Sequence, residues 1–195
     1  PAVASLYALR CLKDSGVKLT KKVQLLLGSA EETGSEDIDW YLEHYKMPPM
    51  VFSPDADFPL VNTEKGRVAA KLTASGTENP EGVYVMRFNA GTVANAVPGT
   101  ASCGVVGTSV DAVEAAIRLA NIPGVTFDVR TCCHGNTHIT ATGVAAHASL
   151  PEQGKNAACA LLAVLSKLGL TDAPGNNALL ALHRAMPYGD FGGHA

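Results

Sequence analysis

Three carboxylates follow two short apolar segments in the N-terminal part of this 195-residue sequence. Glu31 and Glu32 come soon after the apolar run 23–27, and Asp55 comes soon after the apolar run 50–52. Short, almost unbroken apolar runs are typical of strands that are covered on both faces of a parallel sheet. Because parallel strands end at the same edge of a sheet, where α/β proteins bind ligands, we expect these carboxylates to share one pocket. Adjacent acids in a pocket suit metal binding or acid–base catalysis.

The same acidic segment also has a purely structural interpretation. Ser29 and Glu32 have the spacing of a capping box, in which a serine and a later acid hold the first turn of a helix. A phosphate-binding loop is excluded, because segment 28–35 lacks the Gly-Lys-Ser/Thr ending and its two carboxylates would repel a phosphate. Spacing alone leaves both the catalytic and the capping interpretation open.

Another group of ligand-type residues lies near the middle of the second half of the chain. Cys132, Cys133, His134 and His138 are residue types that bind zinc. The intervening pair 135–136, Gly-Asn, predicts a hairpin turn, and no second ligand pair follows at the spacing of a zinc site. We therefore favour an exposed hairpin over a metal site at this position.

Two further polar residues have small neighbours that leave room for a ligand. Asn95 lies in a turn-rich segment, and His147 lies between a predicted strand and a predicted helix. An imidazole is able to donate a hydrogen bond to a developing oxyanion, and an asparagine amide is able to contact a substrate. The structural alternatives are a turn residue for Asn95 and a solvated loop histidine beside a helix-capping Ser149 for His147.

The elements that must position these residues change in type near Gly66. Before it, predicted helices alternate with the two apolar runs, which indicates an α/β segment with a parallel sheet over residues 1–66. After it, apolar and polar residues alternate as in antiparallel strands, and two amphipathic helices follow. This pattern predicts an α+β domain of ferredoxin-like type over residues 67–195. The predicted helices are 1–14, 35–45, 109–121, 149–168 and 178–185, and the predicted strands after Gly66 are 68–73, 83–88, 99–107, 125–132 and 138–144.

Composition narrows the classes of partner and compartment. A formal net charge of -3 with 17% charged residues gives no basic surface for nucleic acid or for an anionic membrane. No apolar run approaches the roughly 18 residues that a membrane span requires, and the first residues do not resemble a secretion signal. An odd number of cysteines, five, does not form a disulfide framework. We expect reduced thiols and a cytoplasmic location.

Four motifs occur in order along the chain: GSAEETGS, FSPDADFP followed by NTEKG, NAGTVANAVPGTA, and GVAAHASLPEQGKNA. Together they resemble a family of di-zinc metallopeptidases, and the resemblance extends over nearly the whole chain. The family includes peptidase-V-type bacterial dipeptidases, carnosinase, aminoacylase and carboxypeptidase G. The segments PDADFP and TEKG resemble the dipeptidase branch most closely.

This resemblance implies roles for the residues singled out above. In the family, a catalytic domain binds two zinc ions, with manganese or cobalt as alternatives, and an inserted ferredoxin-like lid closes over a small peptide substrate. By resemblance, Glu31 is the general base, Glu32 is a ligand of one zinc ion, and Asp55 is a ligand of the other. His147 of the lid stabilises the tetrahedral oxyanion, and Asn95 contacts the substrate. The implied chemistry is attack by an activated water on an amide carbonyl.

The resemblance also assigns the two parts of the chain. Residues 1–66 correspond to part of the catalytic domain, and residues 67–195 correspond to the lid, whose exposed sheet edge is a candidate surface for a homodimer. The family also uses a His-x-Asp segment, a bridging aspartate and a late histidine, and no His-x-Asp occurs in these 195 residues. We therefore expect an internal fragment with two of five ligands, which binds zinc weakly and does not hydrolyse peptides alone.

Two other functions fit the same motifs. An N-acyl amino acid hydrolase, such as an aminoacylase or a desuccinylase, cleaves a similar amide with the same metal chemistry. A non-catalytic α+β module for binding or dimerisation is the alternative outside enzymes. Recovery of the missing ligand types in flanking sequence would favour an enzyme, and their absence would favour the binding module.

Overall fold

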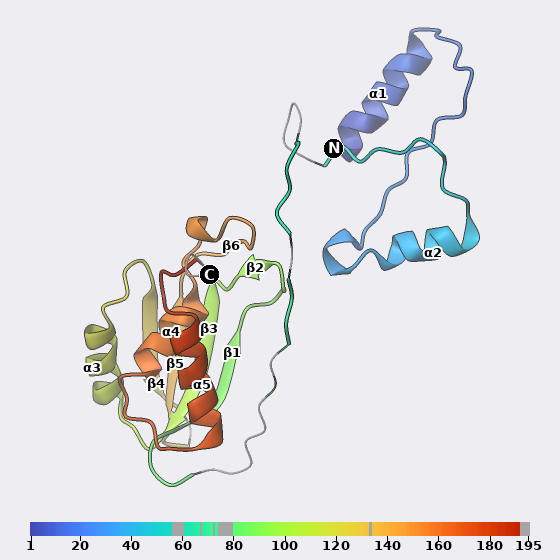
Figure 1. Ribbon diagram of the computed structural model, residues 1–195. Helices are drawn as coiled ribbons and strands as arrows, with labels where there is room; N and C mark the ends of the chain where they lie inside the picture. Colours follow the sequence, from blue (N-terminus) through green and yellow to red (C-terminus); the bar gives the residue numbers. More distant parts are fainter. Residues whose placement is uncertain (56–60, 67, 72, 74–79, 133, 192–195) are drawn as a thin grey trace. The chain divides into compact units, whose positions relative to one another are not determined.

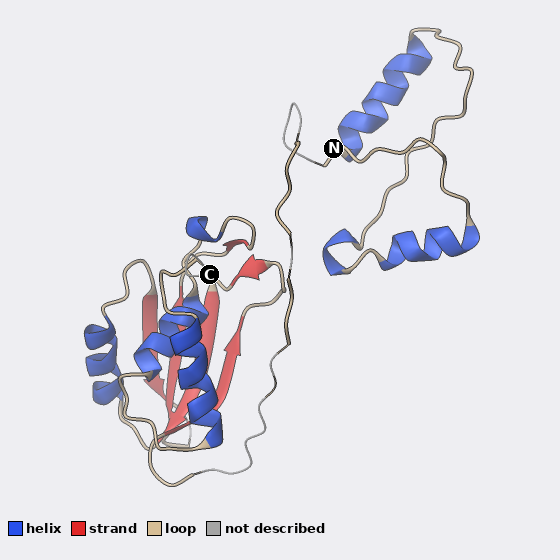
Figure 2. Ribbon diagram, viewed as in Figure 1, coloured by secondary structure: helices blue, strands red, loops and turns tan. Residues whose placement is uncertain are grey.

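The computed structural model describes residues 1–55, 61–66, 68–71, 73, 80–132 and 134–191. The chain divides into two compact units, Pro1–Gly66 (unit 1) and Arg67–Ala195 (unit 2). Among the described residues, every strand belongs to unit 2, whereas helices occur in both units (Figures 1 and 2). In the same residues, no helix is both long and apolar enough to cross a membrane.

Unit 1 contains two α-helices and one 3-10 turn. The helices α1 (Ala2–Asp14) and α2 (Glu36–His44) confirm the two helices predicted from the sequence, and η1 (Glu31–Thr33) contains the paired glutamates. Ser35 stands at the N-cap position of α2, but its side chain makes no capping hydrogen bond, and its backbone is left-handed with φ 61°. The position of the helix predicted over 35–45 is therefore confirmed, although the serine at its start does not cap it.

The parallel sheet predicted for unit 1 is wrong. Neither apolar run, 23–27 or 50–52, forms a strand, and the sheet of this protein is antiparallel and lies in unit 2. Val23, Leu27 and Phe52 are 52%, 66% and 87% exposed. A strand is stabilised by hydrogen bonds to a neighbouring strand and by side chains packed on its faces. The apolar runs have neither in the described residues, so their apolar character alone does not produce a sheet.

Unit 2 is built on a four-stranded antiparallel sheet with helices, as predicted for an α+β domain. The strand order is β1-β3-β5-β4, and a separate two-stranded ladder pairs β2 with β6. The segment predicted as a strand over 68–73 forms none in its described residues, and most of the loop predicted over 76–82 lies outside them. The strands are β1 (Tyr84–Ala90), β2 (Ala96–Val97), β3 (Thr100–Val106), β4 (Thr126–Thr131), β5 (Thr137–Thr142) and β6 (Ala146–His147).

Three helices cover one face of the four-stranded sheet. The central helix α4 (Ala157–Leu165) packs on β3 and β5, while α3 (Val110–Ala120) packs on β4 and α5 (Pro174–Ala185) packs on β1. Figure 1 shows α4 and α5 side by side in front of the sheet, with α3 beside them. Helix α4 is apolar on nearly all sides, as expected for a helix enclosed by a sheet and two other helices. The unit buries its core between the helices and the sheet; it includes Cys103, Val105, Val113, Ile139, Leu161 and Leu165.

The connections of this sheet resemble part of a ferredoxin-like fold. Strand β3, helix α3 and strand β4 form a crossover in which β5 lies between the two strands, which is the split unit of that fold. The buried Asn176 fixes α5 against the edge of the sheet. Its side-chain oxygen accepts the Val85 amide at 3.1 Å, and its amide nitrogen donates to the carbonyls of Val83 and Thr171 at 3.2 and 2.8 Å.

Two helix starts in unit 2 show which local signals were informative. Ser109 caps α3, because its hydroxyl accepts the Ala112 amide at 3.2 Å. The helix predicted over 149–168 starts only at Ala157, where the Asn156 side chain accepts the amides of Ala158 and Cys159. A 3-10 turn, η2 (Pro151–Gln153), occupies the start of the predicted helix. Ser149 is therefore not the cap of this helix.

Candidate active site

The paired glutamates of unit 1 lie in a compact turn that is closed by backbone hydrogen bonds. The Ala30 carbonyl accepts the Thr33 amide at 3.1 Å and the Ser35 amide at 2.7 Å. Gly34 allows this closure because its φ of 117° lies in the left-handed region that favours glycine. Glu31 and Glu32 are exposed. The turn therefore presents two adjacent carboxylates to the surface of unit 1.

Asp37 holds the N-terminal side of this acidic turn. Its Oδ2 atom accepts the backbone amides of Ser29 at 2.5 Å and Ala30 at 3.1 Å. The Ser29 amide is the largest influence on the Asp37 carboxyl, followed by an opposing effect of burial and then by the amides of Ala30 and Ile38, and the net result is a lowered pKa. A Cβ atom added to Gly28 would lie 2.9 Å from Oδ2, so a glycine fits best there. This carboxylate therefore connects α2 to the residues just before Glu31.

The capping-box interpretation of the acidic segment is wrong. The N-cap position of η1 is Ala30, which has no side-chain cap, and Ser29 instead donates its amide to Asp37. The acids therefore belong to an independent turn rather than to the start of an α-helix. This observation excludes the capping-box interpretation, but it does not by itself assign a catalytic role to Glu31.

Asp55 is exposed and lies at the end of a described segment without regular secondary structure. Among residues that the structure describes, no group of three or more His, Cys, Asp or Glu side chains is arranged to hold a metal ion. The convergence of Glu31, Glu32 and Asp55 expected from the sequence is thus not observed. The reason is that the parallel strands expected to bring them to one sheet edge are not formed.

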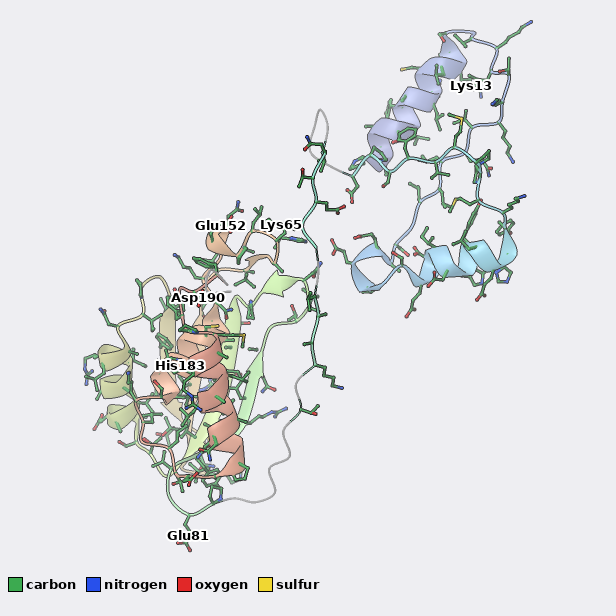
Figure 3. All side chains as sticks on the ribbon, in the orientation of Figure 1. Lys13, Lys65, Glu81, Glu152, His183 and Asp190 are labelled. Carbon is green, nitrogen blue, oxygen red and sulfur yellow. The ribbon has the colours of Figure 1, made fainter. Side chains whose placement is uncertain are left out.

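The structure does bring together the two polar residues predicted in unit 2. In the β2–β6 ladder, Ala96 pairs with His147 and Val97 pairs with Ala146. The Asn95 carbonyl accepts the Ala148 amide at 2.8 Å, which continues the backbone contact beyond the ladder. Asn95 and His147 are 52 positions apart, yet they lie on directly adjacent backbone segments. Turn η2 packs against β6, and it carries Glu152, which Figure 3 labels.

The imidazole of His147 has a defined partner on one of its two nitrogens. Its Nδ1 atom lies 2.6 Å from the Ser149 hydroxyl and 3.2 Å from the Ser149 backbone nitrogen. The His147 carbonyl accepts the Leu150 amide at 2.9 Å, so a tight turn follows the histidine. His147 is exposed. The ring is thus held at Nδ1 while remaining accessible to a ligand.

A small pocket lies beside this ladder. It has a volume of about 190 Å³. Its lining is made of small and apolar residues, with two threonines as the polar side chains: Gly91, Thr92, Ala96, Val97, Pro98, Gly99, Thr100 and Ala145. Typical sites for small ligands have volumes of about 300–1,000 Å³. The pocket is therefore smaller than a typical site for a small ligand.

The cysteine and histidine group around the predicted hairpin is a turn between β4 and β5. The Cys132 amide donates to the Asn136 carbonyl at 2.8 Å, and the Gly135 amide donates to the Cys132 carbonyl at 3.0 Å. Gly135 has φ 77°, as a tight turn requires. Cys133 lies outside the described residues. Among the described residues, including His134 and His138, there is no cluster that could hold a metal ion.

Two residues that shape these sites were missed as such by the sequence analysis. Asp37 was not singled out, and Ser149 was interpreted only as a helix cap. For Asp37, no local signal indicated a contact with an amide eight residues earlier. For Ser149, a usable signal was present, because serine two residues after histidine permits a local side-chain hydrogen bond.

Comparison with known proteins shows which class of protein this chain is similar to. No family model matches the chain. The chain is 34% identical over 172 residues to the β-Ala-Xaa dipeptidase of Lactobacillus delbrueckii subsp. lactis, which covers 86% of this chain and 36% of that protein. It is 32% identical over 176 residues to the putative dipeptidase YtjP of Bacillus subtilis strain 168, covering 89% of this chain and 38% of that protein. The resemblance to dipeptidases indicated by the ordered motifs is confirmed.

A third relative leads to the same class. The putative dipeptidase SAB1611c of Staphylococcus aureus strain bovine RF122 / ET3-1 is 29% identical over 178 residues, covering 87% of this chain and 37% of that protein. The chain is thus homologous to proteins named dipeptidases along most of its own length. It spans 36% to 38% of the length of these curated relatives.

Proposed function

We propose that this chain contributes catalytic and substrate-contacting residues to a zinc-dependent dipeptidase. The observation that supports this most strongly is the 34% identity over 86% of the chain to a protein named β-Ala-Xaa dipeptidase. Because the chain spans 36% of that relative, the proposal concerns the whole protein in which this sequence occurs. In this proposal, unit 1 is part of the catalytic domain and unit 2 is the lid.

The residues of this chain fit part of a zinc centre, but not a complete one. Carboxylate oxygens are suitable zinc ligands, and catalytic sites use three protein ligands. Glu32 and Asp55 provide two carboxylates of the right type, yet no group of three ligand-type side chains occurs in the described part of the chain. We therefore assign these two residues as ligands that act together with further ligands. Two zinc ions, when bound, polarise an amide carbonyl and make water more acidic.

Glu31 is the proposed general base. Its carboxylate lies next to the proposed ligand Glu32 in a closed turn, so one carboxylate is able to bind metal while its neighbour accepts a proton. Glu31 would take a proton from the attacking water and deliver it to the leaving amine nitrogen. Asp37 limits the movement of the turn by holding the backbone just before it.

His147 and Asn95 are the proposed substrate-contacting residues of unit 2. The accessible imidazole would donate a hydrogen bond to the oxyanion that forms when water attacks the carbonyl. The adjacent position of Asn95 on the neighbouring segment supports a shared role in binding the substrate. The proposed substrate is a small dipeptide, in accordance with the names of the relatives. Hydrolysis of an N-acyl amino acid is the alternative within enzymes, because it breaks the same kind of bond.

A binding or dimerisation role is the alternative outside enzymes. Strand β4 is an edge of the four-stranded sheet, so its outer side is available for pairing with a strand of a second copy. A homodimer formed through unit 2 is compatible with either function. A cytoplasmic location remains a prediction from the sequence.

The test of this proposal is the variant Glu31→Gln in the whole protein. Loss of the proton acceptor should lower kcat for a dipeptide by roughly 10²- to 10⁴-fold, whereas zinc content measured by metal analysis should be unchanged. Glu43→Gln, which alters another exposed glutamate of unit 1, is the matched control and should retain activity. Retained turnover by Glu31→Gln would exclude Glu31 as the base, and absence of hydrolysis by the wild type would favour the binding module.

A further inference from the structure

The contact between His147 and Ser149 determines which ring nitrogen carries the proton. A backbone amide has a hydrogen to donate and no lone pair in the direction of its partner, so Nδ1 must be the acceptor of the Ser149 N–H at 3.2 Å. The Ser149 hydroxyl, 2.6 Å from the same atom, is then also a donor. A proton on Nδ1 would face the amide hydrogen directly. The neutral ring therefore has its proton on Nε2.

The backbone around the ring is held independently of this contact. Pairing of His147 with Ala96 fixes its strand, and the Ala148 amide donates to the Asn95 carbonyl at 2.8 Å. The next turn is closed by the bond from the Leu150 amide to the His147 carbonyl. The histidine backbone is thus held on both sides. The contacts of Ser149 therefore affect only the rotation of the ring and its tautomer.

Ser149 does not cap a following helix. Helix α4 begins eight residues later, at Ala157, and its cap is Asn156. Turn η2 has Leu150 at its N-cap position and no side-chain cap. The orientation of the Ser149 hydroxyl towards Nδ1 is therefore not a consequence of helix capping.

We propose that Ser149 is a positioning residue that keeps His147 in the tautomer with the proton on Nε2, so that this N–H is available to donate to substrate. Ser149 occupies Nδ1, and the accessible imidazole presents Nε2 as its only other nitrogen. His147 then acts as a hydrogen-bond donor and not as a base. This inference rests on the proposed function in one respect only. The proposed function identifies the group that accepts the Nε2 hydrogen bond as the oxyanion formed during amide hydrolysis.

The tautomer is measurable in the 195-residue chain without metal or substrate. In ¹⁵N-labelled chain at about pH 8.5, where an ordinary histidine is neutral, long-range ¹H–¹⁵N correlation distinguishes a protonated from an unprotonated ring nitrogen. The His147 signals are assigned by their loss in His147→Gln. We expect the wild-type ring to be protonated on Nε2. A wild-type ring protonated mainly on Nδ1 would overturn the inference without the need for any further variant.

Two variants of Ser149 test the contribution of the hydroxyl. Ser149→Ala removes one donor but keeps the backbone N–H, and should raise the ratio of the Nδ1-protonated to the Nε2-protonated form roughly two- to tenfold. Ser149→Thr keeps a hydroxyl and should restore the wild-type ratio. Ser109→Ala, which removes the cap of α3, is the matched control that lowers stability without changing the His147 ratio. An unchanged ratio in Ser149→Ala would overturn the role of the hydroxyl.

The same variants in the whole protein separate this inference from the proposed function. Ser149→Ala should lower kcat for a dipeptide roughly two- to tenfold with little change in KM, because the interaction is made only with the oxyanion. If the whole protein hydrolyses no dipeptide while the tautomer shifts as expected, the proposed function fails and the positioning by Ser149 stands. If the tautomer shifts and kcat does not change, the catalytic use of the Nε2 proton is overturned.

Discussion

Unit 1 and unit 2 both contain apolar segments and bury them to very different extents. No described residue of unit 1 is buried, and most residues of its two apolar runs are exposed. In unit 2, by contrast, Val105, Ile139 and Leu161 are completely buried between the helices and the sheet. The difference does not come from the apolarity of the residues, because Leu27 in unit 1 and Leu161 in unit 2 are the same residue type.

The comparison shows that a partner is needed before an apolar run becomes a strand or a core. Each strand of the four-stranded sheet in unit 2 has at least one paired neighbour within the unit, and three helices close its inner face. In unit 1, the runs 23–27 and 50–52 have no paired strand among the described residues. Since the hydrophobic free energy depends on the area removed from water, these runs contribute little to the stability of unit 1.

Truncation of a leucine in each unit should produce the largest contrast. Leu161→Ala removes a completely buried side chain from α4 and should lower the free energy of unfolding by about 2–5 kcal/mol. Leu27→Ala, at a site that is 66% exposed, should change it by less than about 0.5 kcal/mol. Urea denaturation followed by far-UV circular dichroism measures both values. Equal losses would show that unit 1 buries Leu27, contrary to the structure.

The cysteines extend the comparison to chemical reactivity. Burial raises the pKa of the Cys103 thiol to about 12 from its ordinary value of 9.0, which lowers its thiolate fraction about a thousandfold at neutral pH. Cys11 in α1 is exposed. Iodoacetamide should therefore label Cys11 rapidly and Cys103 only when unit 2 opens, as measured by peptide mass mapping. Because unfolding releases the Cys103 proton, unfolding should also become easier as the pH rises from 9.0 towards 12.

Comparable labelling rates for the two thiols under native conditions would contradict this prediction. The control is labelling in denaturant, where burial is lost and both thiols should react at similar rates. A difference that persisted in denaturant would have to come from local sequence and not from burial.

Removal of a serine at the start of a helix should give the smallest contrast. Ser109→Ala deletes the hydroxyl that accepts the Ala112 amide, and should cost about 1 kcal/mol of stability. Ser35→Ala should have almost no effect, because the Ser35 side chain makes no capping bond to α2. Thermal unfolding followed by circular dichroism provides the measurement. A loss at Ser35 as large as at Ser109 would show that the cap of α2 forms in solution.

Local patterns placed most of the helices and four of the five predicted antiparallel strands. The periodicity of α1 and α3 and the apolar patterns of β1, β3, β4 and β5 are each contained within a few turns or one strand, so sequence was sufficient to place them. The alternation over 68–73 was misleading, because its described residues form no strand. The start of α4 was misplaced because Ser149 and Asn156 are both good caps, and only the closed turns from Ala148 to Gly154 decide between them.

The candidate site also has features that the sequence predicted and features that only the structure showed. The residue types at positions 31, 32 and 55 suggested only metal binding or acid–base catalysis. The ordered motifs that contain positions 31, 32, 55, 95 and 147 carried the resemblance to dipeptidases, and the relatives named dipeptidases confirm that resemblance. The contact of Asp37 with the acidic turn joins residues eight positions apart, and the adjacency of Asn95 and His147 joins segments about 50 positions apart. Sequence spacing carries no direct information on such pairs, since their approach depends on how the intervening chain folds.

The sequence by itself determined which residues are able to do chemistry and which segments are able to form helices, because both properties depend on residue type and short-range periodicity. Only the tertiary structure decided that the described residues of unit 1 form no sheet. It also decided that β2 and β6 bring Asn95 close to the histidine backbone. These outcomes depend on pairing and packing between distant segments, whose free energy is gained only when the partners meet in three dimensions.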